Sequence, residues 1–252
     1  MLDLMKFILS LIAFAVLIPG VSCAQAVYEP GYIVTLNGDT VRGFVNDPHW
    51  VSNPDRFEFK QTMDGAVTLY KALAVQAFGV SNRTYVSAVA DVEISPIETS
   101  DLETNSAFRM ATDTVFLTPI FQGSKSLYYN RQGRRFYYYI GRGPSGFELL
   151  QYKKYYREAT NSVAENSKFV GQLITYLDDC PGVSKRLSNT NYTQLSLEKI
   201  FQKYYYSCKH VDIRPIREVQ ERRAPSDPPT SELGVFVGVS MSSILFRTSN
   251  PE

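Results

Sequence analysis

The chain has 252 residues, enough to bury a sizeable core in one domain or two. Its 26 Lys and Arg residues nearly balance its 25 Asp and Glu residues, so charge gives no reason to expect nucleic acid or an anionic surface as a partner. Aromatic content is the unusual feature, with 17 Tyr and 15 Phe. Tyr is favoured in strands that have one packed face and one wet face.

Residues 1–24 have the pattern of a secretory signal peptide. Lys6 precedes the apolar run Phe7–Ile18, and small residues follow that run. Its twelve residues are too few to span a bilayer as a helix, which needs about 20. Cleavage after Ala24 would leave Gln25 as the new N-terminus. The sequence therefore predicts an exported protein of the periplasm or outer membrane.

Export changes how the three cysteines are interpreted. Cys23 leaves with the signal peptide or, in an alternative that stays open, becomes a lipoprotein cysteine. Cys180 and Cys208 remain, and an even number of thiols in an exported chain predicts a disulfide. Closing that loop stabilises the fold by about 3–4 kcal/mol in the chain-entropy model. Two buried free thiols are the alternative, and a catalytic thiol is not expected because only His49 and His210 could act as its base.

Residues 27–160 are predicted to form an antiparallel β domain built from hairpins. Gly31–Val45 contains two alternating segments joined by Asn37-Gly38, a dipeptide that tolerates the positive φ angles of a type I′ turn. A polar loop is expected over residues 95–106. The other expected strands are Arg56–Lys60 with Ala66–Tyr70, Ala74–Val80 with Arg83–Ala88, Met110–Phe121, and Lys125–Tyr129 with Arg134–Ile140 across the turn Asn130–Gly133.

The segment Gly141–Gly146 matches the G-x-G-x-x-G pattern of dinucleotide-binding loops. Such a loop must open a helix whose N-terminal N–H groups receive the pyrophosphate, inside a strand–helix–strand unit. The run that ends at Ile140 is instead the second arm of a hairpin. The glycines are followed by Phe147–Tyr156, which is rich in aromatic residues and bounded by turn residues. We interpret the segment as a hairpin loop, and no cofactor is predicted.

The same region interleaves basic and aromatic side chains. This pattern can bind single-stranded nucleic acid, but an exported protein does not meet that partner. The ordinary interpretation places Tyr on a half-buried sheet and Lys and Arg on its wet face. The alternative is a ligand surface that contacts a glycan, a lipid headgroup or a peptide. Its candidate residues are Arg134, Tyr137, Tyr139 and Lys153.

Residues 161–210 are predicted to form two helices tied by the disulfide. The first carries the stripe Phe169, Leu173, Ile174 and Leu177 and stops before Pro181. A second stripe follows, made of Leu195, Leu197, Ile200, Phe201, Tyr204 and Tyr205. Fully antiparallel helices would hold the two cysteines apart, so the disulfide predicts a sharp angle or a shorter second helix.

Two segments complete the chain. Residues 211–232 are charged and then proline-rich, which is typical of a linker. Residues 233–252 contain an alternating strand whose Val235, Val237, Val239 and Met241 face one way, opposite small and polar residues. About ten residues of this pattern are typical of a membrane-spanning β-strand. A single strand cannot cross a bilayer, so it either pairs with the preceding domain or begins a longer barrel.

With these motifs in place, the sequence resembles the N-terminal periplasmic region of exported Bacteroidota proteins of the porin family, which are outer-membrane β-barrel proteins. The resemblance lies in Gly31–Val45, in the Tyr-rich hairpins between Ser126 and Ile140, in Tyr176–Pro181, in Lys203–Cys208 and in the Gly-Val-x-x-Gly-Val strand at 234–239. It implies a truncated frame or further barrel strands after Glu252. It implies no enzymatic activity and carries over no functional residues.

The expected fold class is α+β, mainly antiparallel β: a hairpin-rich sandwich or roll, a two-helix unit and a terminal strand. We expect a non-enzymatic cell-envelope protein, the periplasmic domain of an outer-membrane barrel, with the outer membrane as its partner. The alternative is a soluble periplasmic module that binds a glycan or peptide on its Tyr-rich sheet. No H-E-x-x-H, G-x-S-x-G or P-loop motif supports an enzyme, and no specific protein partner can be inferred.

The intact mass of the native protein tests export and completeness together. A cleaved, disulfide-bonded product is expected to have the mass of Gln25–Glu252 less two hydrogens. Mass spectrometry of protein recovered from the producing cell measures this. That mass would contradict a barrel in this gene product, and a substantially larger mass would contradict the soluble module.

Overall fold

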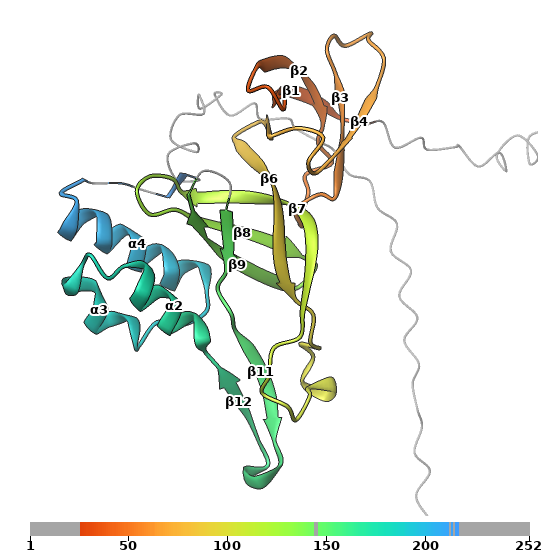
Figure 1. Ribbon diagram of the computed structural model, residues 1–252. Helices are drawn as coiled ribbons and strands as arrows, with labels where there is room; N and C mark the ends of the chain where they lie inside the picture. The colour runs from red at the N-terminus through yellow and green to blue at the C-terminus, as the bar shows by residue number, and fades with distance from the viewer. Residues whose placement is uncertain (1–25, 144–145, 212, 214, 217–252) are drawn as a thin grey trace, which may run out of the picture.

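The computed structural model describes residues 26–143, 146–211, 213 and 215–216. A ten-stranded antiparallel sheet forms the main body, with helices packed on one side and a separate two-stranded hairpin projecting from it (Figure 1). The strand order in the sheet is β10-β9-β8-β7-β6-β5-β1-β2-β3-β4. This confirms the predicted α+β class with mainly antiparallel strands.

Most strands pair with their neighbours in sequence, as expected for a chain of hairpins. The exception is β1, which pairs with β5 as well as with β2. The strands of the sheet are β1 (Tyr28–Val34), β2 (Thr40–Asn46), β3 (Arg56–Lys60), β4 (Thr68–Lys71), β5 (Ala77–Val80), β6 (Arg83–Glu93), β7 (Met110–Phe121), β8 (Leu127–Gln132), β9 (Arg135–Arg142) and β10 (Gly146–Leu149). The projecting hairpin consists of β11 (Lys153–Arg157) and β12 (Ser162–Asn166).

The first hairpin forms where it was predicted, but its turn type differs. The Gly38 N–H donates to the Thr35 carbonyl at 3.0 Å, and Gly38 has a φ of 92°. Asn37 is not among the described residues with positive φ, so the predicted type I′ turn is wrong. The loop is a type I turn followed by one left-handed glycine, which needs a single positive φ angle rather than two.

Two later turns also shape the sheet. Gln132 pairs with Arg135, so the loop between β8 and β9 is Gly133 and Arg134, and the turn predicted from Asn130 begins too early. Asn130 is a buried strand residue. After β9, Gly146 opens β10 and pairs antiparallel with Arg142. The glycine-rich segment therefore joins two hairpin strands, and no helix follows it, as the hairpin interpretation predicted.

Strand β7 bends the sheet into a roll. Its first part pairs with β6 from Met110 to Leu117, and its last part pairs with β8 from Thr118. The register shifts between Pro119 and Phe121, where proline removes one ladder donor and a bulge redirects the strand. In Figure 1 the ribbons of β8 and β9 consequently run across those of β6 and β7. The far strand β10 lies back against β6, which closes the roll.

Asn53 fills the fork where β7 leaves β8. Its amide donates to the Phe116 carbonyl at 2.8 Å and to the Thr118 hydroxyl at 3.1 Å. Its side-chain oxygen accepts from the Arg131 N–H at 3.0 Å, and its own N–H donates to the Arg131 carbonyl at 2.9 Å. One residue thus bonds to backbone groups on both diverging strands, and the Phe116 carbonyl also accepts from the Asn130 amide at 3.0 Å.

The roll encloses one core and supports another on its outer side. Residues Ala88, Ala90, Val92, Val115, Leu117, Tyr137, Tyr139 and Leu149 form the inner cluster. Because side chains alternate along β9, Tyr138 and Ile140 point the other way and pack under the helices. Both faces of β9 are therefore buried. A third cluster, which includes Phe57, Phe78 and Phe116, holds the N-terminal strands together.

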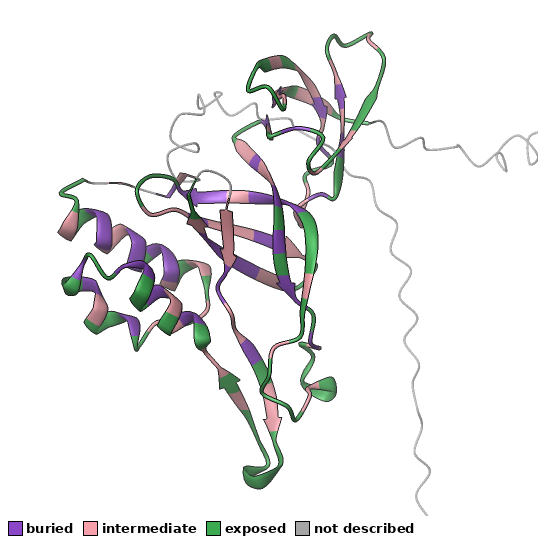
Figure 2. Cartoon of the chain, viewed as in Figure 1, coloured by how far each residue is buried: buried purple, intermediate pink, exposed green. Residues whose placement is uncertain are grey.

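In the described part of the chain three α-helices, rather than the two predicted, cover the outer side: α2 (Lys168–Tyr176), α3 (Pro181–Leu187) and α4 (Gln194–Cys208). Their buried residues lie toward the sheet (Figure 2). Pro181 does not merely end the first helix. It begins α3 at the N-terminal position where its missing N–H costs nothing. Ile174 and Leu195, counted in the predicted apolar stripes, are exposed.

The extra helix explains how the cysteines meet. Cys180 precedes α3 and Cys208 ends α4, and the two form a disulfide with their Cα atoms 5.8 Å apart. The predicted pairing is confirmed. The chain reverses through α3, so neither a sharp angle between two helices nor a shorter second helix is required. The disulfide closes a separation of 28 residues between the two cysteines.

The strand β12 was not predicted. It pairs with β11 from Ser162 to Asn166, so the expected boundary between residues 160 and 161 falls inside a hairpin. The helices pack in one cluster with β7, β8 and β9, and they do not form a separate unit. Isolated polar residues such as Ser162 and Glu165 give no strand signal of their own. They are held here by pairing with β11.

Several predicted features lie outside the described residues. These are the signal segment 1–24 with the cleavage site Ala24–Gln25, most of the linker 211–232, and the strand carrying Val235, Val237, Val239 and Met241. In the described part of the chain, no helix combines the length and apolar character needed to cross a membrane.

Replacing Asn53 with alanine is expected to lower the free energy of unfolding by about 2 kcal/mol, because the Arg131 N–H loses its acceptor and the Thr118 hydroxyl loses its donor. Urea denaturation of the purified protein measures the change. Asn189→Ala is the matched control, since the Asn189 side chain is exposed beside α3. Equal stabilities of the two variants would contradict a structural role for the fork.

Candidate functional site

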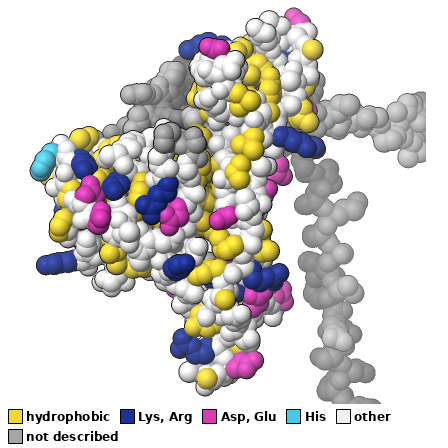
Figure 3. Space-filling view, viewed as in Figure 1, with side chains coloured by type: hydrophobic (Ala, Val, Ile, Leu, Met, Phe, Trp, Pro, Cys, Tyr) yellow, Lys and Arg dark blue, Asp and Glu magenta, His cyan; other side chains and the backbone are white. Residues whose placement is uncertain are grey.

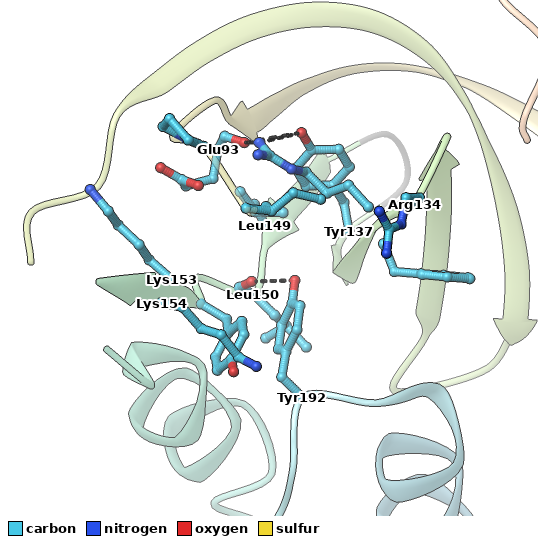
Figure 4. A pocket seen from close by; sticks show the side chains of 13 residues that line it. Glu93, Arg134, Tyr137, Leu149, Leu150, Lys153, Lys154 and Tyr192 are labelled. Atoms are coloured by element: carbon cyan, nitrogen blue, oxygen red, sulfur yellow. Dashed lines mark hydrogen bonds between the residues drawn. The ribbon is translucent and has the colours of Figure 1, made fainter. Parts of the chain in front are cut away.

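A cavity of about 270 Å³ opens where β9 and β10 meet the loop after β6 and the segment before α4. Glu93 and Tyr137 lie on one side of it and Tyr192 lies opposite, with Lys153 and Arg134 toward its two ends (Figure 4). Its apolar lining comes from Pro96, Ile97, Phe136, Leu149 and Leu150.

Arg135 ties the wall of the cavity to the loop after β6. Its guanidinium donates to the backbone carbonyls of Glu93 and Ser95 and, at 3.2 Å, to the Tyr137 hydroxyl. The Tyr137 hydroxyl in turn donates to the Glu93 carbonyl at 3.0 Å. The cation is thus held by neutral carbonyl and hydroxyl oxygens, and it contributes positive potential to the cavity.

Among the described lining residues the single carboxylate belongs to Glu93, and donors inside the protein hold it. It accepts from the N–H groups of Ser95 at 3.1 Å and Arg109 at 3.2 Å, and also from the Ser95 hydroxyl. Glu93 is 6% exposed. These hydrogen bonds to the Glu93 carboxylate stabilise the loop that follows β6, so the carboxylate has a structural role.

Lys153 is also committed to a structural contact. Its ammonium donates to the Glu103 carboxylate at 2.6 Å and to the Ala107 carbonyl at 2.7 Å, and its side chain is 1% exposed. The bond from Lys153, reinforced by Arg109, lowers the pKa of Glu103 to about 2. This pair fastens the long loop 94–109 to β11.

Two tyrosine rings form the opposite wall. Tyr152 and Tyr192 stack with their ring centres 4.6 Å apart. The Tyr192 hydroxyl donates to the Leu150 carbonyl at 2.8 Å and accepts from the Tyr138 N–H at 3.2 Å. Burial raises the pKa of Tyr192, and burial together with Glu165 raises the pKa of Tyr152. Both phenols therefore stay neutral at physiological pH and present ring surface to the cavity.

The structure brings three of the four predicted ligand-surface residues to this cavity. Tyr137 and Lys153 line it, although both polar groups already have partners inside the protein. Arg134 lines its open end with a side chain that is 81% exposed and 3.1 Å from the Glu98 carboxylate. Tyr139 does not line the cavity. It is 0% exposed inside the roll, because its position on β9 directs the side chain into the inner core.

The prediction that the ligand surface lies on an open face of the Tyr-rich sheet is therefore wrong, because the helices and the inner core cover both faces of β9. Several lining residues were missed, namely Glu93, Pro96, Ile97, Leu149 and Tyr192. They belong to a loop, a short strand and a segment before a helix, and they carry no common sequence pattern. Only the basic and aromatic interleaving around β9 pointed to this region.

One cluster has the residue types of a metal site. Glu29, Asp47 and His49 each offer one ligand atom, and these atoms lie within 4.8 Å of one another. The Asp47 carboxylate, however, is paired with Arg83 and accepts from the His49 N–H at 2.8 Å. Glu29 accepts from the Ser81 hydroxyl. Internal contacts account for this cluster, and a cation there would compete with a guanidinium.

Charge on the visible face is mixed. Lys and Arg side chains are interspersed with Asp and Glu (Figure 3). In comparisons with known proteins, no protein family, no curated protein and no solved structure matches this chain.

Replacing Glu103 with glutamine is expected to lower the melting temperature, because it leaves the buried Lys153 ammonium without its anionic partner. A carboxyl whose pKa is depressed on folding stabilises the protein above its ordinary value of 4.5, and that stabilisation is lost as pH falls toward 2. The difference between wild type and variant should therefore shrink across this range.

Thermal unfolding followed from pH 6 to pH 2 measures this. Arg109→Gln is the control: it removes the exposed partner of Glu103 and keeps the Lys153 pair, so its effect at pH 6 should be smaller. A Glu103→Gln deficit that stays constant over the whole range would contradict the pairing.

Proposed function

We propose that this chain is an exported, non-enzymatic protein of the cell envelope, and that its β-roll binds a ligand combining a ring with a negative charge. One observation carries the proposal. The cavity beside β9 has most of its polar groups already bonded within the protein, which leaves aromatic and apolar surface with cations at the rim. Such a cavity suits a ligand with an apolar ring face and an anionic substituent.

Among the described lining residues, Arg134 and Lys154 are the rim cations that have no buried partner. Arg134 is exposed at one end, where its planar guanidinium is able to grip a carboxylate through two parallel hydrogen bonds. Lys154 is exposed and lies at the other side of the cavity. Glu98 contacts Arg134 only at the surface, where a ligand carboxylate competes on equal terms.

Binding fits this cavity better than catalysis. The Glu93 carboxylate is held by internal donors. The phenols of Tyr137, Tyr152 and Tyr192 all have pKa values raised, with burial as the largest cause. A general acid or base works best when its pKa lies near the working pH. These groups instead favour a fixed wall that positions a ligand.

Export and envelope location rest on other features. The Cys180–Cys208 disulfide suits an oxidising compartment, and residues 1–24 have the pattern of a signal peptide. The resemblance to periplasmic regions of Bacteroidota outer-membrane barrel proteins adds the outer membrane as a partner. In that arrangement the β-roll would stand in the periplasm and residues 233–252 would enter the membrane.

The binding proposal is tested with 4-nitrophenyl β-D-glucuronide, which carries a ring and a carboxylate, against the neutral 4-nitrophenyl β-D-glucoside. Calorimetric titration of the mature protein is expected to show saturable binding of the glucuronide alone. Arg134→Gln should weaken that binding roughly tenfold, as expected for loss of one charge-assisted contact.

Arg157→Gln is the matched control, because Arg157 is an exposed arginine on the projecting hairpin and does not line the cavity. Its affinity should equal that of the wild type. Equal binding of the glucoside and the glucuronide, or equal losses in the two arginine variants, would contradict an anion-recognising cavity.

A further inference from the structure

We propose that the ligand is an acidic oligosaccharide long enough to occupy a second subsite, on the far side of Phe136 from the cavity described above; this inference rests on the proposed function. The second hollow has a volume of about 260 Å³. Phe136 lines both hollows. They adjoin there, so a chain of linked rings is able to cross from one to the other.

The segment before α4 forms part of the same divide. Tyr192 lines the first hollow, and Gln194, two residues later, lines the second. Phe136 belongs to β9, so the divide is built from two separate parts of the chain. A ligand that fills both hollows would therefore place its first two units in the first hollow and pass its further units over Phe136 into the second.

The second hollow is cationic and aromatic. Arg83 and Arg131 line it together with the rings of Trp50, Tyr85 and Tyr129, and its described lining contains no Asp or Glu. The Arg83 guanidinium is paired with the buried Asp47. The Arg131 guanidinium lies over the Phe136 ring, with its central carbon 5.0 Å from the ring centre, and its Nε donates to the Gly133 carbonyl at 3.0 Å.

Arg131 is therefore the cation of this hollow with capacity for a ligand. Among the described residues, no salt bridge to a carboxylate occupies it, and its side-chain hydrogen bond uses Nε and leaves the two terminal nitrogens available. Planar guanidinium groups bind carboxylates through two parallel bonds. Arg134 in the first hollow and Arg131 in the second thus offer one arginine in each of the hollows that Phe136 lines. This suits a chain with a carboxylate on each sugar unit and ring faces that stack on Phe136.

A peptide fits the second hollow less well. Extended peptides commonly bind by adding a strand to a free sheet edge, where backbone groups are unpaired. Strands β8 and β9 are interior to the sheet. Beyond the end of the β7 ladder, Asn53 occupies the backbone N–H and carbonyl of Arg131. Recognition at this hollow must come from side chains. Aromatic and arginine side chains favour a carbohydrate, whose sugar rings stack on the aromatic rings and whose carboxylates bind the arginine.

The test compares digalacturonate with hexagalacturonate by calorimetric titration of the full mature chain. The longer chain is expected to bind roughly tenfold more tightly, since it adds a second charge-assisted contact. Arg131→Gln should remove that gain and leave the affinity for digalacturonate unchanged. Arg157→Gln should change neither, and unaltered melting temperatures would show that the variants are folded.

The outcomes separate the two proposals. If digalacturonate binds and hexagalacturonate binds no more tightly, or if Arg131→Gln weakens both ligands equally, the second subsite is overturned while the first cavity stands. If hexaglutamate binds as tightly as hexagalacturonate, the oligosaccharide is overturned in favour of an acidic peptide. If neither galacturonate nor the nitrophenyl glucuronide binds, the proposed function itself fails.

Discussion

The bend in strand β7 is the constraint on which the rest of this structure depends. One twelve-residue strand serves two neighbours, β6 along its first part and β8 along its end. Pro119 and the adjacent bulge change its direction, and Asn53 bonds to the backbone groups left at the fork. A flat sheet would have exposed the aromatic residues of β9. The roll instead encloses Tyr137 and Tyr139 on its inner side and leaves the outer side to the helices.

The helices and the cavity follow from that geometry. Because β9 is buried on both faces, helices α2 and α4 must cover its outer side, and the disulfide holds their connection in place. The cavity lies at the margin of this covered region, where the segment before α4 meets the loop after β6. Most polar groups there make structural contacts within the protein: Lys153 pairs with Glu103, and Arg135 donates to backbone carbonyls. The aromatic ring surface and the rim cations Arg134 and Lys154 remain available to a ligand.

The two proposals follow from the same physical distinction between committed and available groups. A charge that already has a buried partner gains little from a ligand, whereas a guanidinium without such a partner keeps its bidentate capacity. Arg134 is exposed in the first hollow, and Arg131 lies over the Phe136 ring in the second, so each of the two hollows that Phe136 lines has one such arginine. Lys153, although predicted as a ligand-surface residue, does not, because Glu103 and Ala107 hold its ammonium.

The sequence alone determined the local elements: the hairpins at Gly38 and Gly133, the antiparallel class, the helical stripe around Leu173 and the pairing of the two cysteines. The hairpins and the helical stripe depend on interactions between residues close together in the chain. The cysteine pairing follows from the even number of cysteines left in a chain predicted to be exported to an oxidising compartment. Only the tertiary structure decided that β12 is a strand, that a third helix joins the cysteines, and that Tyr139 is sealed inside the roll. The cavity was likewise beyond the sequence, because Glu93, Arg134 and Tyr192 are brought together by the bend of β7 and by docking of α4. Such contacts join positions far apart in the chain and leave no periodic pattern in it.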